Sequence, residues 1–191
     1  MCGRYSLFTT EEDKEIQQII AEVNRNNPEI QLKTGEIFPT NTAPVLIGGK
    51  QALEVKPLIW GFPNFRSKGV IINARAETAA EKRMFQDSLL HRRCVIPSTG
   101  FYEWKQDANK QKYLFRNPSD SVTYMAGFWN EYEGERRFVI LTTAPNESMR
   151  EIHNRMPVVL PKGEIENWVF HLDAAMELLH RIPPLLYKEA I

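Results

Sequence analysis

Near the start of the chain, a few acidic residues are followed by apolar residues at every third or fourth position. This pattern predicts an amphipathic helix over Thr9–Val23, with Thr9 or Thr10 as its N-cap. A second apolar set predicts a helix over Thr78–His91. Two further helical segments are predicted near the end of the chain, over Gly163–Phe170 and Asp173–His180.

The rest of the chain has short apolar runs rich in β-branched and aromatic residues, separated by Gly, Pro, Asn and Asp. Two runs joined at Gly48, Gly49 and Lys50 predict a hairpin. Further strands are predicted at RCVIP, GFYEWKQ, KYLFR, VTYMAGFWN, RRFVILTTA and MPVVL. The pattern predicts one α+β domain over residues 1–191, a mostly antiparallel curved sheet or open barrel with a few peripheral helices.

Composition narrows the class of protein. The 191 residues are 42% hydrophobic and 25% charged, as in an ordinary globular protein, and no apolar stretch approaches the ~20 residues of a membrane span. Two cysteines and no secretory signal favour the cytoplasm. Because 24 basic residues balance 24 acidic ones, any nucleic-acid binding must come from a local patch. Neither HExxH nor paired Cys/His spacing occurs, so we expect no metal and no cofactor.

Cys2 is the first candidate for chemistry. Removal of Met1 would leave an α-amine and a thiol on one residue, and an α-amine with a pKa near ~7.7–8.0 is partly nucleophilic at neutral pH. The amine can attack an aldehyde to give an imine, which the thiol can close to a five-membered thiazolidine. Cysteine can also stand at position 2 by accident. Cys94, within an apolar strand pattern, is expected to be a small buried hydrophobe.

Three further residues are candidates for the same site. Asn73 and Arg75, two apart on an extended segment, would point the same way, Asn73 toward a hydroxyl or amine and Arg75 toward a phosphate; they can equally be a simple helix entry. Glu103 between Tyr102 and Trp104 suits proton transfer if it is desolvated, or is a solvent-facing acid. His153 is the best acid–base candidate among four histidines, or a surface loop residue.

A basic strip beside the N-terminus is a further possibility, with Trp60 as a platform for base stacking, unless Trp60 belongs to the core. Its members would be Arg4, Arg75, Lys82, Arg83, Arg92 and Arg93.

Together these segments resemble one known family. The matching segments, in chain order, are Met1-Cys2-Gly3-Arg4-Tyr5, Asn41-Thr42-Ala43-Pro44, Trp60-Gly61, Asn73-Ala74-Arg75-Ala76-Glu77-Thr78, Gly100-Phe101-Tyr102-Glu103-Trp104 and His153-Asn154-Arg155-Met156-Pro157. The set resembles the SRAP family, the SOS response-associated peptidase domain, whose members crosslink to abasic DNA. The resemblance runs from Cys2 to about Leu160.

The resemblance implies covalent capture of abasic sites in single-stranded DNA through a thiazolidine on Cys2, with Asn73, Glu103 and His153 as the other catalytic residues. It also implies that these residues excise Met1. DNA contacts would come from Arg4, Trp60, Arg75 and Arg83. We expect a monomer in the cytoplasm, at the nucleoid when DNA is damaged, and a retained Met1 in or near the pocket of Asn73, Glu103 and His153.

One departure concerns the segment after Trp60, where many relatives carry further tryptophans. Here Gly61-Phe62-Pro63-Asn64-Phe65 follows, which leaves the grip on the 3′ side of the lesion open. Two other functions remain alternatives. One is a thiol peptidase acting on other proteins through Cys2, His153 and Asn73, and the other is a noncovalent single-stranded DNA-binding module in which Cys2 is dispensable.

Overall fold

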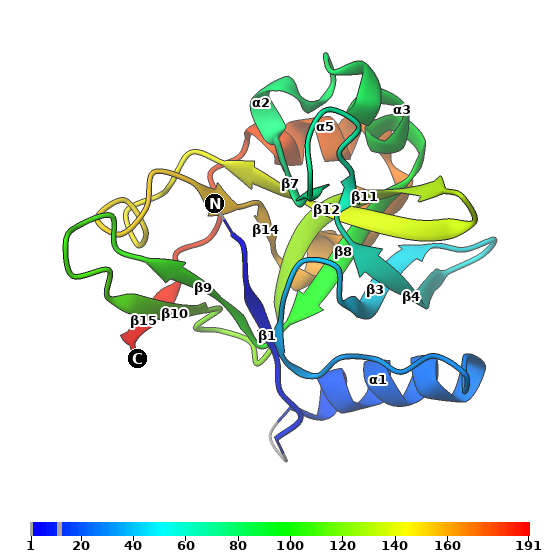
Figure 1. Cartoon of the computed structure of the whole chain (residues 1–191), viewed down its shortest axis with the longest axis horizontal. Helices are drawn as coiled ribbons and strands as arrows, with labels where there is room; N and C mark the ends of the chain where they lie inside the picture. The colour runs from blue at the N-terminus through cyan, green and yellow to red at the C-terminus, as the bar shows by residue number, and fades with distance from the viewer. Residues whose placement is uncertain (1, 11–12) are drawn as a thin grey trace.

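Mostly antiparallel strands form the centre of the structure, a computed structural model that describes residues 2–10 and 13–191, with helices at its periphery (Figure 1). The strands are β1 (Tyr5–Leu7), β2 (Gly35–Ile37), β3 (Thr42–Gly48), β4 (Leu53–Trp60), β5 (Phe62–Pro63), β6 (Val70–Ile71), β7 (Asn73–Arg75), β8 (Arg93–Ser98), β9 (Gly100–Trp104), β10 (Lys112–Arg116), β11 (Thr123–Tyr132), β12 (Glu135–Thr143), β13 (Met156–Pro157), β14 (Val159–Leu160) and β15 (Tyr187–Ala190). The helices are α1 (Lys14–Asn26), α2 (Ala76–Ala79), α3 (Arg83–His91), α4 (Ile165–Phe170) and α5 (Leu172–His180), with a 3-10 turn η1 (Lys162–Glu164).

Strands β3, β4, β12, β11 and β8 pair in a ring. The predicted hairpin β3–β4 is present, and β8 joins β3 to β11, which forms a long hairpin with β12. The ring closes because β12 also pairs with β4, in parallel, at Arg137↔Ile59 and Phe138↔Trp60. The structure confirms the predicted α+β class built on a curved, mostly antiparallel sheet, and the barrel is closed rather than open.

A second sheet has the order β15-β10-β9-β1-β2, and every neighbouring pair in it is antiparallel. It joins the start of the chain to the Gly100–Trp104 segment through Tyr5↔Phe101. Gly100 begins β9 at φ +144°, and a Cβ there would lie 2.6 Å from the carbonyl oxygen of Phe115. Only glycine therefore lets β10 pack this closely on the strand that carries Glu103.

The helices differ from the sequence prediction in two places. α1 runs over Lys14–Asn26 instead of Thr9–Val23, so it begins and ends later than predicted, and its N-cap is Asp13 and not Thr9 or Thr10. Two of the acids expected in its first turn, Glu11 and Glu12, lie outside the described residues. The single helix predicted over Thr78–His91 is wrong, since α2 and α3 are separate. α2 packs on β7, β12 and α5, whereas α3 packs on β8 and β11, and one straight helix cannot reach both sets of strands.

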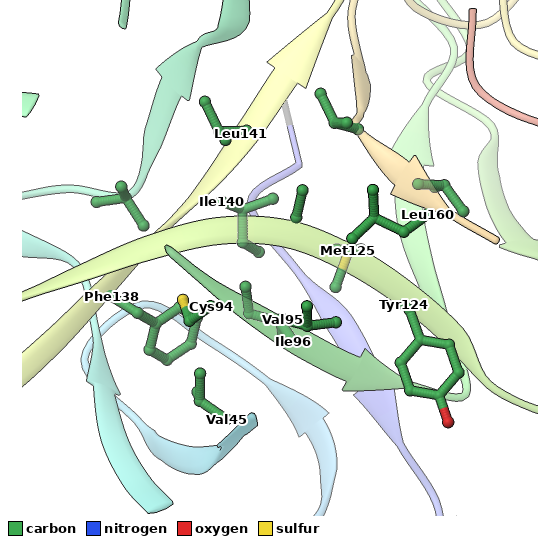
Figure 2. Packing of buried hydrophobic residues seen from close by; sticks show 14 of the residues in the cluster. Val45, Cys94, Val95, Ile96, Tyr124, Met125, Phe138, Ile140, Leu141 and Leu160 are labelled. Carbon is green, nitrogen blue, oxygen red and sulfur yellow. The ribbon is translucent and has the colours of Figure 1, made fainter. Parts of the chain in front are cut away.

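The main core fills the barrel and the space beneath the helices. Figure 2 shows side chains from β3, β8, β11, β12 and β14 converging there, among them Val45, Val95, Met125 and Ile140, all fully buried. Cys94 lies in this cluster as a free thiol, as predicted, and burial raises its pKa well above the ordinary value. In the part of the chain that the structure describes, no helix is long and apolar enough to cross a membrane.

Candidate active site

Cys2 is fully buried at the start of the chain, just before β1. Its backbone carbonyl accepts a hydrogen bond from Nδ2 of Asn73, at 2.9 Å. Asn73 reaches this position because β7 pairs in parallel with β12, at Ile140↔Asn73. The Asn73 amide thus ties the N-terminal segment to the rim of the barrel, across 71 positions of sequence.

The oxygen of the same amide is a free acceptor. Oδ1 of Asn73 is buried and has no hydrogen-bond partner among the residues that the structure describes. A buried acceptor without a partner costs about 1–3 kcal/mol, so such atoms are uncommon unless a ligand or a water satisfies them. Asn73 is therefore built to hold a donor, such as an amine or a hydroxyl, beside Cys2.

Glu103 approaches Cys2 from β9. Its side chain is 5% exposed, and burial raises the pKa of its carboxyl above the ordinary value. The Glu103 carboxylate in turn helps burial to raise the pKa of the Cys2 thiol. A raised carboxyl pKa brings proton transfer by Glu103 closer to neutral pH, and a raised thiol pKa keeps Cys2 protonated there.

His153 faces Glu103 from the loop before β13. Its Nε2 lies 3.9 Å from Oε2 of Glu103, and its Nδ1 accepts the backbone N–H of Arg155 at 3.0 Å. Nδ1 also lies 3.2 Å from the carbonyl oxygen of Arg155, so the backbone of Arg155 contacts Nδ1 on both its N–H and its C=O, and Nε2 is the ring nitrogen that faces Glu103. Burial lowers the pKa of His153, so the ring is neutral at physiological pH.

Arg155 holds this loop in place. Its guanidinium donates to both carboxylate oxygens of Glu77, at 2.6 and 2.8 Å, and to the carbonyl of Thr142, at 2.6 Å. The backbone N–H and carbonyl of the same residue both contact Nδ1 of His153, at 3.0 and 3.2 Å, and so hold the orientation of the ring. The sequence motif contains Arg155, but only the fold shows that it anchors the histidine loop to α2 and β12.

The structure therefore brings together the four residues predicted to carry the chemistry, Cys2, Asn73, Glu103 and His153. The match to the family model SOS response associated peptidase (SRAP) covers residues 1–187. The chain belongs to the SRAP family.

Two relatives of known sequence agree with this assignment, and one solved structure shares the fold. Over 88% of its length the chain is 36% identical to abasic site processing protein YoqW of Bacillus subtilis, covering 80% of that protein. It is 30% identical to abasic site processing protein YedK of Escherichia coli, covering 88% of this chain and 79% of that one. A crystal structure of a Bacteroides thetaiotaomicron protein, 24% identical, superposes with a TM-score of 0.80 over 100% of this chain and 92% of the other.

The residues predicted to contact DNA in this SRAP chain differ in their exposure to solvent and in their ion pairs. Arg75 and Arg83 are exposed, at the end of β7 and the start of α3. Arg4, by contrast, is ion-paired with Glu36, at 3.1 Å. Met1, expected near the pocket, lies outside the described residues, so its position stays a prediction.

Trp60 is not available as a stacking platform, and that expectation is corrected. The side chain is fully buried, with its ring 5.2 Å from that of Tyr5 and 6.2 Å from that of Phe138, centroid to centroid. Its indole N–H donates to the carbonyl of Ile72, at 3.1 Å. Trp60 instead supports the segment that leads into Asn73.

Arg93 is also removed from the predicted basic strip. It is 6% exposed, and its guanidinium donates only to backbone carbonyls at the ends of α3 and α4. Arg92 is partly exposed and paired with Asp87. The strip expected from the run of basic residues is therefore interrupted, because α3 turns into β8 at this point and points Arg93 inward.

An exposed aromatic that the sequence reading did not assign lies in the segment after Trp60. Phe65 is 81% exposed, beside a hollow of about 530 Å³ that is also lined by Arg66, Lys82, Arg83 and Met84. An aromatic ring among cations is the combination that binds a single strand, by stacking and by phosphate contact. The signal in the sequence was an aromatic between polar and basic residues, Asn64-Phe65-Arg66.

Proposed function

We propose that this protein processes abasic sites in single-stranded DNA by forming a thiazolidine between Cys2 and the ring-opened sugar. The observation that carries the proposal is the convergence on one N-terminal cysteine of a free amide acceptor, a carboxyl with a raised pKa and a neutral imidazole. The names of the SRAP relatives, abasic site processing proteins, support the same substrate.

The proposed reaction starts once Met1 has been excised by the same residues. The α-amine of Cys2 attacks the aldehyde carbon of the open sugar, and loss of one water gives an imine. The thiol sulfur then bonds to that carbon while its proton passes to the nitrogen, which closes the ring. One water is released overall, and the ring closure is intramolecular, so a protonated thiol suffices.

Each neighbouring group has a matching role in the proposal. The Asn73 oxygen accepts a hydrogen bond from the amine or from a sugar hydroxyl. Glu103 donates the proton that the leaving hydroxyl needs, a contribution of typically ~10²–10⁴-fold. His153, whose Nε2 faces Glu103, relays protons between Glu103 and the sugar.

A thiol peptidase acting on other proteins fits the site less well. Such enzymes attack with a thiolate, which an adjacent imidazole or helix N-terminus stabilises. Here burial and Glu103 raise the pKa of the Cys2 thiol, and the Sγ atom contacts the carbonyl oxygen of Arg4, at 3.8 Å. Removal of Met1 from its own chain remains part of the proposal, because the peptide bond to be cut adjoins Cys2 and does not have to be bound from solution.

The proposed path of the strand runs over the exposed cations near the site. Arg75 follows Asn73 by two residues, and Arg83 lies in the hollow beside Phe65. A base stacked on Phe65 would be stabilised by roughly 1–3 kcal/mol whatever its identity. We propose that Phe65 takes the role that the sequence reading gave to Trp60.

The test is a denaturing gel of the protein mixed with a single-stranded oligonucleotide that carries one abasic site. We expect a stable adduct with the natural protein and none with Cys2→Ala, whereas Cys2→Ser retains the amine and gives a weaker product that borohydride traps. Cys94→Ala, which removes the other thiol, is the matched control and should behave like the natural protein.

Four outcomes would contradict the proposal. A stable adduct from Cys2→Ala would refute the cysteine mechanism, and normal crosslinking by protein that mass spectrometry shows to retain Met1 would refute the role of the α-amine. Cleavage of unrelated peptides without any DNA adduct would favour the peptidase instead. If the Cys2 variants bind DNA noncovalently as well as the natural protein and no form gives an adduct, the protein is a noncovalent DNA-binding module.

A further inference from the structure

A single carboxylate holds two cations on the five-stranded sheet. Oε2 of Glu36, in β2, accepts from Nη1 of Arg4 at 3.1 Å, and its Oε1 accepts from Nζ of Lys112, in β10, at 2.7 Å. The side chains of Arg4, Glu36 and Lys112 are 31%, 31% and 23% exposed. Solvent, and therefore an anion from solution, can reach the cluster.

Aromatic rings hold the same two cations. Cζ of Arg4 lies 4.3 Å from the ring centroid of Phe38 and 5.1 Å from that of Trp104. Nζ of Lys112 lies 4.0 Å from the ring centroid of Tyr102. Cation–π contacts of this kind do not need Glu36, so both cations would stay in place if its carboxylate moved away.

The charges of the cluster do not cancel. The hydrogen bond from Lys112 is the largest of the contacts that lower the pKa of Glu36, so the carboxylate is ionised at neutral pH and gives one negative charge between two positive ones. A DNA phosphodiester also carries one delocalised negative charge on two oxygens. It can accept from the same two donors in the same way as the carboxylate.

The cluster adjoins the site of the proposed function. Arg4 follows Cys2 by two residues, so their Cα atoms are at most about 7 Å apart, and Trp104 follows Glu103 directly on β9. A strand that places its abasic sugar at Cys2 therefore has a neighbouring phosphate within reach of Arg4.

We infer that Glu36 occupies, in the free protein, a subsite for a DNA phosphodiester formed by Arg4 and Lys112, so that DNA must displace this carboxylate to bind there. The inference rests on the proposed function, because it takes single-stranded DNA as the ligand. As a consequence, undamaged strands bind weakly, because the phosphodiester must displace Glu36 from Arg4 and Lys112. A strand with an abasic site is held after this displacement by its covalent bond to Cys2.

The opposite role for Glu36 would be to position Arg4 for DNA. The two roles predict opposite changes in DNA affinity when Glu36 is replaced. If Glu36 competes with phosphate, Glu36→Gln should tighten binding of an undamaged single strand by about fivefold at low salt, since two exposed ion pairs no longer have to be broken. If Glu36 only positions Arg4, the same variant binds more weakly.

The experiment measures anisotropy of a fluorescent undamaged single-stranded oligonucleotide over a range of salt concentrations. Glu54→Gln is the matched control, because it removes the same charge from a carboxylate paired with Lys56 on β4. Glu36→Gln should bind about fivefold more tightly than Glu54→Gln. In the double variant Glu36→Gln, Lys112→Gln, most of that gain should be lost. Equal or weaker binding by Glu36→Gln would overturn the inference.

Two further readouts separate this inference from the proposed function. In the single variant Lys112→Gln, Glu36 remains paired with Arg4. This variant should bind the undamaged strand more weakly than the natural protein, which gives an independent check if Glu36→Gln unfolds. Tighter binding by Glu36→Gln without any adduct on abasic DNA would refute the covalent mechanism and keep the subsite. The absence of DNA binding in every form would refute the subsite as well.

Discussion

Replacing Arg93 with Met removes a buried guanidinium that joins the ends of two helices. Nη1 donates to the carbonyls of Leu89 and Leu90, at 3.0 and 2.7 Å, in the last turn of α3. Nε and Nη2 donate to the carbonyls of Trp168 and Val169, at 2.6 and 3.0 Å, in the last turn of α4. The last carbonyls of a helix have no partner within it and carry the negative end of its dipole, so a cation here satisfies both needs.

The magnitude follows from these four bonds and from the cost of burying the charge. A hydrogen bond from a charged donor contributes about 1.5–3 kcal/mol, so a plain sum would reach roughly 6–12 kcal/mol. Desolvation opposes this sum, and it lowers the pKa of Arg93. We expect Arg93→Met to lower the free energy of unfolding by about 3–5 kcal/mol, because four carbonyls lose their donor at about 1–3 kcal/mol each while the cost of burying the charge is recovered.

Urea denaturation followed by circular dichroism measures this change directly. For a chain of 191 residues, each kcal/mol corresponds to a Tm shift of about 2–4 °C, so Tm should fall by roughly 10 °C. Arg92→Met is the matched control, since Arg92 pairs at the surface with Asp87 and should cost no more than about 0.5 kcal/mol. A loss from Arg93→Met within 1 kcal/mol of the control, about the error expected for two such measurements, would refute this account of Arg93.

Three further predictions concern the site and the DNA surface. Glu103→Gln should slow adduct formation by about 100-fold or more while DNA affinity stays normal. Because burial raises the pKa of Glu103, its contribution to stability is present below the ordinary carboxyl pKa near ~4.3 and is lost as pH rises through the raised value. Urea titrations of Glu103→Gln should therefore match the natural protein near pH 4 and gain about 1 kcal/mol near pH 8, and a gain independent of pH would contradict this linkage. Arg75→Ala should reduce the salt slope of single-strand binding by about 0.7, that of one phosphate contact, and an unchanged slope would remove Arg75 from the DNA surface.

Elements with a repeating pattern were predictable from the sequence. α1 was recognised because its apolar residues recur at helical spacing, and the hairpin β3–β4 because Gly48 and Gly49 separate two apolar runs. β1 was not predicted and β7 was expected only as an extended segment, since three residues are too few to show a period. They are strands only because β9, β2 and β12 lie beside them to accept their hydrogen bonds.

The sequence by itself determined which residue types are available for the chemistry: a cysteine at position 2, and an Asn, a Glu and a His in recognisable motifs. Only the tertiary structure decided their surroundings. Asn73 reaches Cys2 because β7 pairs with β12, and Glu103 and His153 acquire shifted pKa values because packing removes water from them. The solvent exposure and the ion pairs of a side chain depend on contacts between segments far apart in the chain, and the local spacing of residues does not predict such contacts. For the same reason Trp60 belongs to the core and Arg4 to an ion pair with Glu36.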